Sequence, residues 1–178
     1  MQETAPQYIQ RVLGYIEGQD AIKVQRSTAA KLKKLIHGLT SKQLKWKSEP
    51  GKWSIGEILA HLADTEVVAS WRMRSVIGSS GTTIQPFDQD AWAAAFAYAK
   101  RDPKQSLEVF RVMRENNLAM LKALPRERWE SYGMHLERGK ETLAHLTRMF
   151  AGHDANHVLQ VERIVGEQKQ KSAKKKRK

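Results

Sequence analysis

Apolar residues recur along most of this chain at intervals of three or four, the spacing that places them on one face of an α-helix. One such stripe runs through residues 20–37, where an aspartate can cap the first turn and a glycine follows the last. Another occupies residues 54–77 and begins with a capping box, in which Ser54 and Glu57 satisfy each other's backbone amides. The pattern therefore predicts two long helices in the first half of the chain.

The second half carries two more long stripes. Residues 102–124 start with Asp-Pro, a capping residue followed by proline at the first helical position. Residues 142–165 form the last stripe, which Gly166 is expected to end, and a short helix is expected over 90–98. Since no stretch alternates between apolar and polar residues in the manner of a strand, we expect an all-α protein, a four-helix bundle.

The distribution of charge separates the chain into two parts. The formal net charge is +12, yet residues 169–178 contain seven basic side chains and no acidic one. A run of like charges repels itself and buries no apolar surface, so we expect residues 1–168 to be a single globular domain and 169–178 a disordered basic tail. Contact of this tail with nucleic acid is the alternative, and without aromatic residues to stack on bases it would not be specific.

The absence of cysteine excludes disulfides and thiolate ligands, so any thiol chemistry must use an external thiol. No apolar run approaches the roughly 20 residues that span a bilayer, and the N-terminus lacks a signal-peptide pattern. We therefore expect a soluble, cytoplasmic protein without membrane contact.

Three histidines are expected to face the interior of the bundle. His153 and His157 are separated by about 40° around their helix, on the face that also carries the apolar stripe. His61 lies on the inward face of the 54–77 helix. A shared divalent ion would satisfy one nitrogen of each ring, whereas the alternative is three separate core histidines bonded to carbonyls or hydroxyls. Three nitrogen ligands leave coordination positions open, as in catalytic sites, and zinc, nickel, iron and manganese are all compatible with them.

Three further side chains are candidates for roles beside the metal site. Gln160 and Thr65 share the histidine faces of their helices and could orient a bound species, or could simply close the bundle. Arg72 lies about 20° from His61 on the helical wheel but farther along, where it could meet a substrate carboxylate. The nearby carboxylates Asp64, Glu57 and Glu66 do not identify a general base, and the catalytic residues stay unassigned.

The histidine segments resemble a known family. Residues 52–66 (Lys-Trp-Ser-Ile-Gly-Glu-Ile-Leu-Ala-His-Leu-Ala-Asp-Thr-Glu) and 152–164 (Gly-His-Asp-Ala-Asn-His-Val-Leu-Gln-Val-Glu-Arg-Ile) are similar to the two motifs of the DinB/YfiT-like superfamily. The resemblance covers about residues 6–167. It implies an up-down-down-up bundle, often homodimeric, with a divalent metal held by three histidines that match His61, His153 and His157.

The resemblance also implies several activities. Characterised members of the superfamily join low-molecular-weight thiols such as bacillithiol, mycothiol or glutathione to electrophiles, one group is a thiol-dependent isomerase, and others are regarded as metal-dependent hydrolases. For this chain we expect a metal-dependent enzyme, with zinc or nickel first among the metals, that acts on a small-molecule substrate. A thiol-dependent S-transferase is the first expectation, a hydrolase using metal-activated water the second, and a non-catalytic metal-binding stress protein the third.

Overall fold

Four long helices form the body of the computed structural model, which describes residues 3–176. They are α2 (Ala21–Ile36), α4 (Ile55–Gly78), α6 (Pro103–Ala123) and α7 (Leu143–Lys176). The first three begin where the sequence predicts a cap: Asp20 and Asp102 each accept a hydrogen bond from a first-turn amide, and Ser54 and Glu57 form the capping box. Within the described chain, no helix is both long and apolar enough to cross a membrane.

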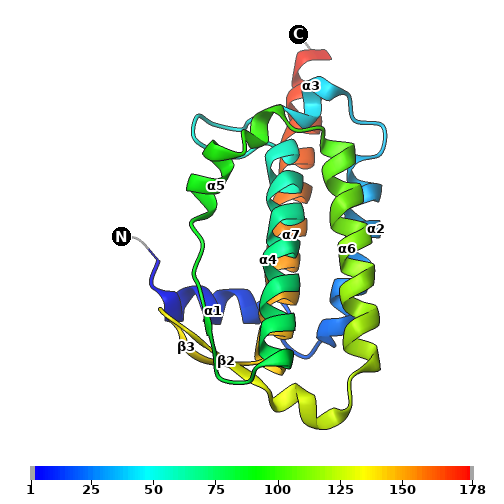
Figure 1. Ribbon diagram of the computed structural model, residues 1–178. Coiled ribbons are helices and arrows are strands. Elements are labelled where there is room, and N and C mark those ends of the chain that lie inside the picture. The colour runs from blue at the N-terminus through cyan, green and yellow to red at the C-terminus, as the bar shows by residue number, and fades with distance from the viewer. Residues whose placement is uncertain (1–2, 177–178) are drawn as a thin grey trace.

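The bundle has the up-down-down-up connectivity that the family resemblance implies. Figure 1 shows α2 rising, α4 and α6 descending side by side, and α7 rising again. Each of the four long helices packs against two of the others: α2 contacts α6 and α7, and α4 also contacts α6 and α7. Since α4 and α6 are parallel, the chain returns between them over residues 79–102, through β1 (Thr82–Ile84), α5 (Gln89–Ala95) and a 3₁₀ turn (Tyr98–Lys100).

A small sheet, which the sequence pattern does not predict, closes one end of the bundle. β1 pairs in parallel with β2 (Tyr132–His135), and β2 pairs antiparallel with β3 (Gly139–Thr142). The strands are three or four residues long, too short to display a period of two. Gly133 is required here, because a Cβ atom would lie 2.5 Å from the Cδ1 atom of Ile84. The remaining elements are α1 (Ala5–Gly14), α3 (Ser41–Leu44) and a 3₁₀ turn (Arg126–Glu130).

The last helix is longer than expected. Gly166 does not end α7, which continues to Lys176, so residues 169–176 are helical rather than an irregular tail, and 177–178 lie outside the described residues. Two contacts with the α3 region hold this extension: the Gln168 amide donates to the carbonyl of Gln43 at 2.8 Å, and the Lys171 ammonium lies 4.6 Å from the ring centroid of Trp46. These contacts offset the roughly 1 kcal/mol that a glycine costs inside a helix.

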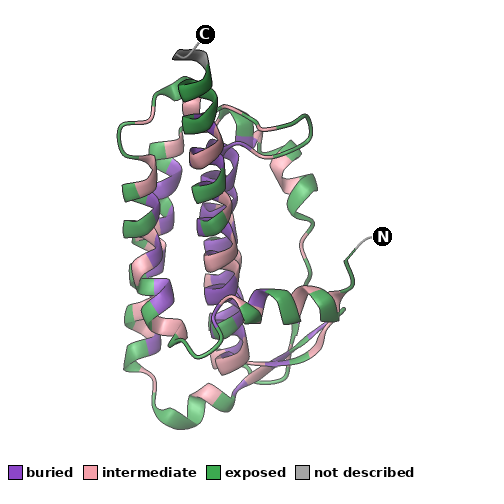
Figure 2. Cartoon of the chain, turned by 180° about the vertical axis from the view of Figure 1, so that it is seen from behind, coloured by how far each residue is buried: buried purple, intermediate pink, exposed green. Residues whose placement is uncertain are grey.

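The core contains two large apolar clusters separated by a polar layer, and a third, smaller cluster formed by Ile16, Val24 and Ala151. One large cluster lies towards α3 and includes Ile58, Leu62 and Phe110, and the other lies towards the sheet and includes Met73, Leu121 and Leu146. Seen from behind in Figure 2, buried residues follow the inner faces of the long helices. The buried polar residues of the intervening layer are Gln25, Thr28, His61, Thr65, Glu66, Arg114, Asn117, Asp154 and His157. The candidate metal site belongs to this layer.

Candidate metal centre

The three predicted histidines meet between α4 and α7. His61 Nε2 lies 3.0 Å from His153 Nε2, which lies 3.1 Å from His157 Nε2. One ring nitrogen from each residue can be chosen so that all three lie within 4.8 Å of one another. His61 and His157 are buried and His153 is half-buried. The helical periodicity therefore placed all three imidazoles correctly.

Hydrogen bonding alone does not account for this arrangement. A ring nitrogen carries either one hydrogen or one lone pair, so His153 Nε2 can make a good hydrogen bond to only one of the two nitrogens beside it. In a tetrahedral site with metal–nitrogen bonds of about 2.0–2.1 Å, the ligand nitrogens lie about 3.3 Å apart. The observed separations are close to that value, and three converging lone pairs suit a divalent cation. The donor set fits a metal ion.

Burial keeps the three rings in the protonation state that binds metal. Removal from water lowers the pKa of His61 and that of His153 well below the ordinary value of 6.5, and the neighbouring imidazoles lower both further. For His157, burial lowers the pKa to about 4, against an opposing hydrogen bond to Gln160. All three imidazoles are therefore neutral at pH 7, as metal ligation requires.

Gln160 and Thr65 both contact the histidines, as predicted. Gln160 Oε1 lies 2.9 Å from Nδ1 of His157 and, by accepting its hydrogen, would leave the lone pair on Nε2, where the ligands converge. Thr65 Oγ1 lies 3.4 Å from Nε2 of His61. The Nδ1 atoms of His61 and His153 are buried without a hydrogen-bond partner among the described residues. The Trp53 ring packs on His61 with a centroid separation of 4.9 Å and covers this side of the site.

The carboxylates nearest to His61 in sequence are engaged elsewhere. Glu57 bonds to Ser54 in the capping box and to Lys47 at 2.8 Å. Asp64 pairs with Arg101 at 2.7 Å. Glu66 accepts hydrogen bonds from Arg114 at 2.6 Å and Asn117 at 2.7 Å, both on α6. The structure therefore assigns none of these three carboxylates as a base beside the metal site.

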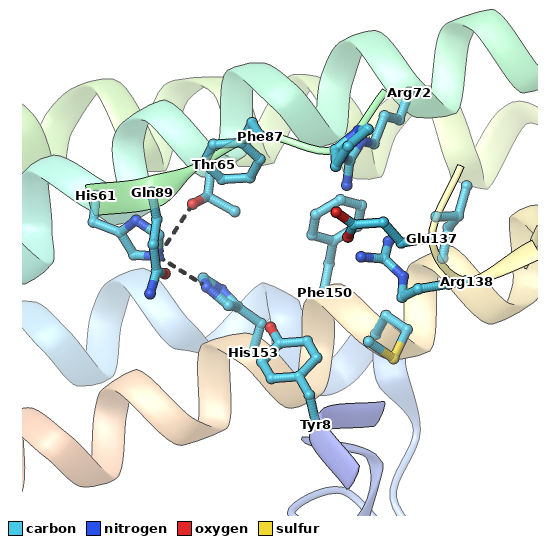
Figure 3. Close-up of a pocket in the computed structure, with 13 residues that line it drawn as sticks. Tyr8, His61, Thr65, Arg72, Phe87, Gln89, Glu137, Arg138, Phe150 and His153 are labelled. Carbon is cyan, nitrogen blue, oxygen red and sulfur yellow. Dashed lines mark hydrogen bonds between the residues drawn. The ribbon is translucent and has the colours of Figure 1, made fainter. Parts of the chain in front are cut away.

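A cavity of about 230 Å³ opens onto His61 and His153. Figure 3 shows the histidines with Thr65 and Gln89 at one end of it and Arg72, Glu137 and Arg138 at the other. The prediction that Arg72 faces the same space as His61 is confirmed geometrically, and its role stays a proposal. Four other polar residues line the cavity and were not predicted, because their position depends on how α1, the start of α5 and the β2–β3 turn pack against the bundle: Tyr8, Gln89, Glu137 and Arg138.

A buried ion cluster lies directly behind the metal site. Arg114 on α6 binds Glu66 on α4 and both carboxylate oxygens of Asp154 on α7. Thr28 on α2 donates to Asp154 at 3.0 Å. Asp154 follows His153 directly in the chain, so this cluster fixes the segment of α7 that carries the candidate ligands His153 and His157.

Comparison with known proteins identifies the family and supports the fold. Residues 26–161 match the sequence profile of the DinB superfamily. The chain is 24% identical to "Putative metal-dependent hydrolase YfiT" of Bacillus subtilis over 145 residues, 80% of this chain and 81% of the relative. It is 25% identical to "Putative metal-dependent hydrolase GK0616" of Geobacillus kaustophilus over 146 residues, 82% of each chain.

A solved structure has the same fold. It is that of YfiT from Bacillus subtilis, described as having "an unusual four-helix bundle topology", with a TM-score of 0.78 at 22% identity. The match covers 83% of this chain and 85% of that one. The up-down-down-up bundle is therefore shared.

Proposed function

Because this chain belongs to the DinB superfamily, with three buried imidazoles converging on one point, we propose that it is a divalent-metal-dependent enzyme that activates a low-molecular-weight thiol for transfer to an electrophile. The observation that carries the proposal is the convergence of three neutral Nε2 atoms beside a cavity. A divalent ion held there would lower the pKa of a coordinated thiol or water and so supply a nucleophile at neutral pH.

The surrounding residues would hold and shield the reacting groups. His61, His153 and His157 would hold the ion, for which zinc and nickel suit three nitrogen ligands. Gln160 would keep the His157 ring in the tautomer that presents Nε2. The Thr65 hydroxyl, which lies beside His61 and lines the cavity, would hydrogen-bond to a substrate atom. Apolar side chains on the other walls would limit the access of water.

The choice of a thiol over water rests on the carboxylates. Metal-dependent hydrolysis generally needs a base that removes a proton from the attacking water. Glu57, Asp64 and Glu66 are held by other groups, and Glu137 lies at the end of the cavity away from the histidines. A thiol ionises more readily than water, and coordination to a metal ion can deprotonate it without a base. The chain has no cysteine that would compete for the metal or the electrophile.

Hydrolysis is the second candidate function. The names of the relatives from Bacillus subtilis and Geobacillus kaustophilus both specify metal-dependent hydrolases. The same site would then act on an ester or amide with no added thiol. Since the two functions differ in this requirement, one pair of assays separates them.

The first experiment tests the metal. Untagged protein purified without chelator should contain about one zinc or nickel ion per chain by elemental analysis, and His153→Ala should lose it while keeping its helical circular dichroism. His145→Ala is the matched control, because His145 lies two turns earlier on α7 and its partner is Glu141 rather than the triad. If the His145 and His153 variants retained equal amounts of metal, the site would be rejected.

The second experiment tests the reaction. Metal-loaded protein is incubated with a fluorogenic bimane electrophile and a panel of thiols, and separately with nitrophenyl esters without thiol. The proposal expects thiol-dependent conjugation that His153→Ala abolishes and His145→Ala preserves. Ester hydrolysis with the same dependence would instead favour the hydrolase, and bound metal without turnover in either assay would favour a non-catalytic role.

A further inference from the structure

The end of the cavity away from the histidines contains an arginine with unused hydrogen-bonding capacity. Arg72 is 7% exposed, and its guanidinium donates to a single acceptor in the described chain, the carbonyl of Gln85, at 2.5 Å. Its Cζ atom lies 5.8 Å from the centroid of the Phe87 ring. A guanidinium offers five N–H donors, so most of its capacity is left for a partner in the cavity.

The charges around Arg72 do not neutralise it by direct pairing. Arg138, the neighbouring cation, is held by two hydrogen bonds to Glu141, at 2.7 and 3.1 Å. In residues 3–176, no carboxylate forms an ion pair with Arg72. Burial, reinforced by Arg138, lowers the pKa of Arg72 to about 10, which reflects the cost of keeping a cation there. Such a cost is ordinarily offset by a bound anion.

We propose that Arg72 binds an anionic group of the substrate, a carboxylate or a phosphate, while the opposite end of the same molecule reaches the three histidines. The inference rests on the proposed function, since it assigns the chemical class of the molecule that the metal site acts upon. Arginine suits this role because its planar fork matches the oxygens of both groups.

The shape of the cavity sets the form of that molecule. His61 and Arg72 both lie on α4 and are eleven residues apart, about 16 Å along the helix axis. Between the two ends, Figure 3 shows Phe87, Phe150 and Tyr8 around the space. The volume of about 230 Å³ excludes a large ligand. The site therefore suits a small, extended molecule with a mostly apolar middle and one anionic end.

Of the two carboxylates near Arg72, Glu141 is paired with Arg138, whereas Glu137 would oppose an anion. It lines the cavity, is exposed, and is unpaired within the described part of the chain. Its negative charge stabilises the Arg72 cation from a distance and would repel an incoming carboxylate. Substitution of Glu137 and substitution of Arg72 should therefore change the affinity for an anion in opposite directions, which a purely structural role for Arg72 would not produce.

The test uses cobalt-loaded protein, with its metal content measured in every variant, and reads binding from the thiolate-to-cobalt absorption band. 6-Mercaptohexanoate should bind to the wild type about ten- to a hundredfold more tightly than 6-mercaptohexanol, because a hydrogen bond to a charged group is replaced by one to a neutral group. Arg72→Gln should remove this preference, Arg72→Lys should retain part of it, and Glu137→Gln should increase it. Equal binding of the two thiols to the wild type would overturn the proposal.

A thiol-free arm separates this proposal from the proposed function. Calorimetric titration with hexanoate and with inorganic phosphate should show Arg72-dependent binding even if neither thiol produces an absorption band. In that outcome the S-transfer proposal fails and the anion site stands, and the tighter of the two anions identifies the group. If neither anion binds, or if Arg72→Gln binds them as well as the wild type does, the anion site is rejected. If Arg72→Gln does not fold, two other measurements still test the anion site. These are the preference of the wild type for 6-mercaptohexanoate over 6-mercaptohexanol and the increase in that preference in Glu137→Gln.

Discussion

The ring nitrogens of the three histidines cannot all satisfy one another by hydrogen bonding. His153 Nε2 faces two other ring nitrogens at 3.0 and 3.1 Å, and no arrangement of hydrogens on neutral rings makes both contacts favourable. In the metal-free protein this leaves a buried polar cluster only partly satisfied. Binding of a metal should therefore stabilise the fold as well as supply chemistry.

The histidines predict how the stability of the metal-free protein depends on pH. The pKa of His157 is about 4 in the folded chain, against 6.5 for the free side chain. Between these values the unfolded state binds more protons, so the free energy of unfolding should fall as the pH is lowered from 6.5 towards 4, by on the order of 3 kcal/mol from this residue. Urea unfolding in the presence of a chelator measures the effect.

The matched variant for this measurement is His157→Gln, which removes the titrating ring. Its unfolding free energy should depend less on pH across the same range, while ordinary carboxylates contribute equally to both proteins. If the two pH profiles ran parallel, His157 would not be the buried neutral group that the structure describes.

The site residues were predictable where the helical period determines their direction. The three histidines converge, Thr65 contacts His61 and Gln160 contacts His157, because positions three and four apart on a helix share a face. Tyr8 and Arg138 could not be found in this way. Their approach to the cavity depends on how α1 and the β2–β3 turn pack against the bundle, which no local pattern in the sequence encodes.

At the scale of elements, α1 is held against α7 by a close backbone approach. A Cβ atom on Gly152 would lie 2.2 Å from the carbonyl oxygen of Val12 and 2.7 Å from its Cγ1 atom. Only glycine permits this contact, which seats α1, and with it Tyr8, beside the cavity. The glycine before His153 therefore serves the wall of the pocket rather than the ligand.

Gly152→Ala should force α1 away from α7. The expected cost is about 1–3 kcal/mol of unfolding free energy, typical of overpacking, with faster hydrogen exchange in α1. Gly166→Ala is the control on the same helix, since no atom lies within 4 Å of the added Cβ, and it should stabilise the protein by about 0.5–1 kcal/mol. Chemical denaturation measures the unfolding free energy of both variants, and mass spectrometry measures hydrogen exchange in α1. If the two variants changed both quantities in the same way, α1 would not be docked through Gly152.

The sequence predicted the starts of the long helices, but not the end of α7 or the short strands. Local capping chemistry determines the start of α4 at Ser54 and of α6 after Asp102, and both starts are confirmed. The predicted end of α7 at Gly166 was wrong: the helix continues to Lys176, and Gln168 and Lys171 in this extension contact the distant α3 region. β1 pairs with β2 across some fifty residues, and β2 and β3 form a hairpin of strands four residues long, so neither pairing shows in a local sequence pattern.

At the scale of the whole molecule, one buried arginine connects the four long helices. Arg114 on α6 binds Glu66 of α4, Asp154 of α7 and the carbonyl of Gln25 on α2. Its side chain is 4% exposed. The relative positions of α4 and α7, on which the histidine geometry depends, are therefore tied to a single charged group.

Replacement of Arg114 by methionine should leave two buried carboxylates without a counter-charge. We expect a loss of about 3–5 kcal/mol in unfolding free energy and weaker metal binding. Arg111→Met is the matched control on the same helix: Arg111 pairs with Glu108 and Glu115 at the surface, and its loss should have little measurable effect. Thermal unfolding and metal titration of both variants test this, and similar behaviour of the two would show that the buried cluster does not organise the bundle.

The cavity is built by two separate parts of the chain. The three candidate ligands are histidines of α4 and α7, inside a packed bundle. The other polar lining residues, Tyr8, Gln89, Glu137 and Arg138, belong to α1 and to the connecting segments. Loops tolerate substitution and insertion far better than packed helices do. A lineage with this architecture can therefore keep its metal chemistry unchanged while it acquires new substrates by altering these segments, and a protein engineer can graft them between members of the superfamily for the same purpose.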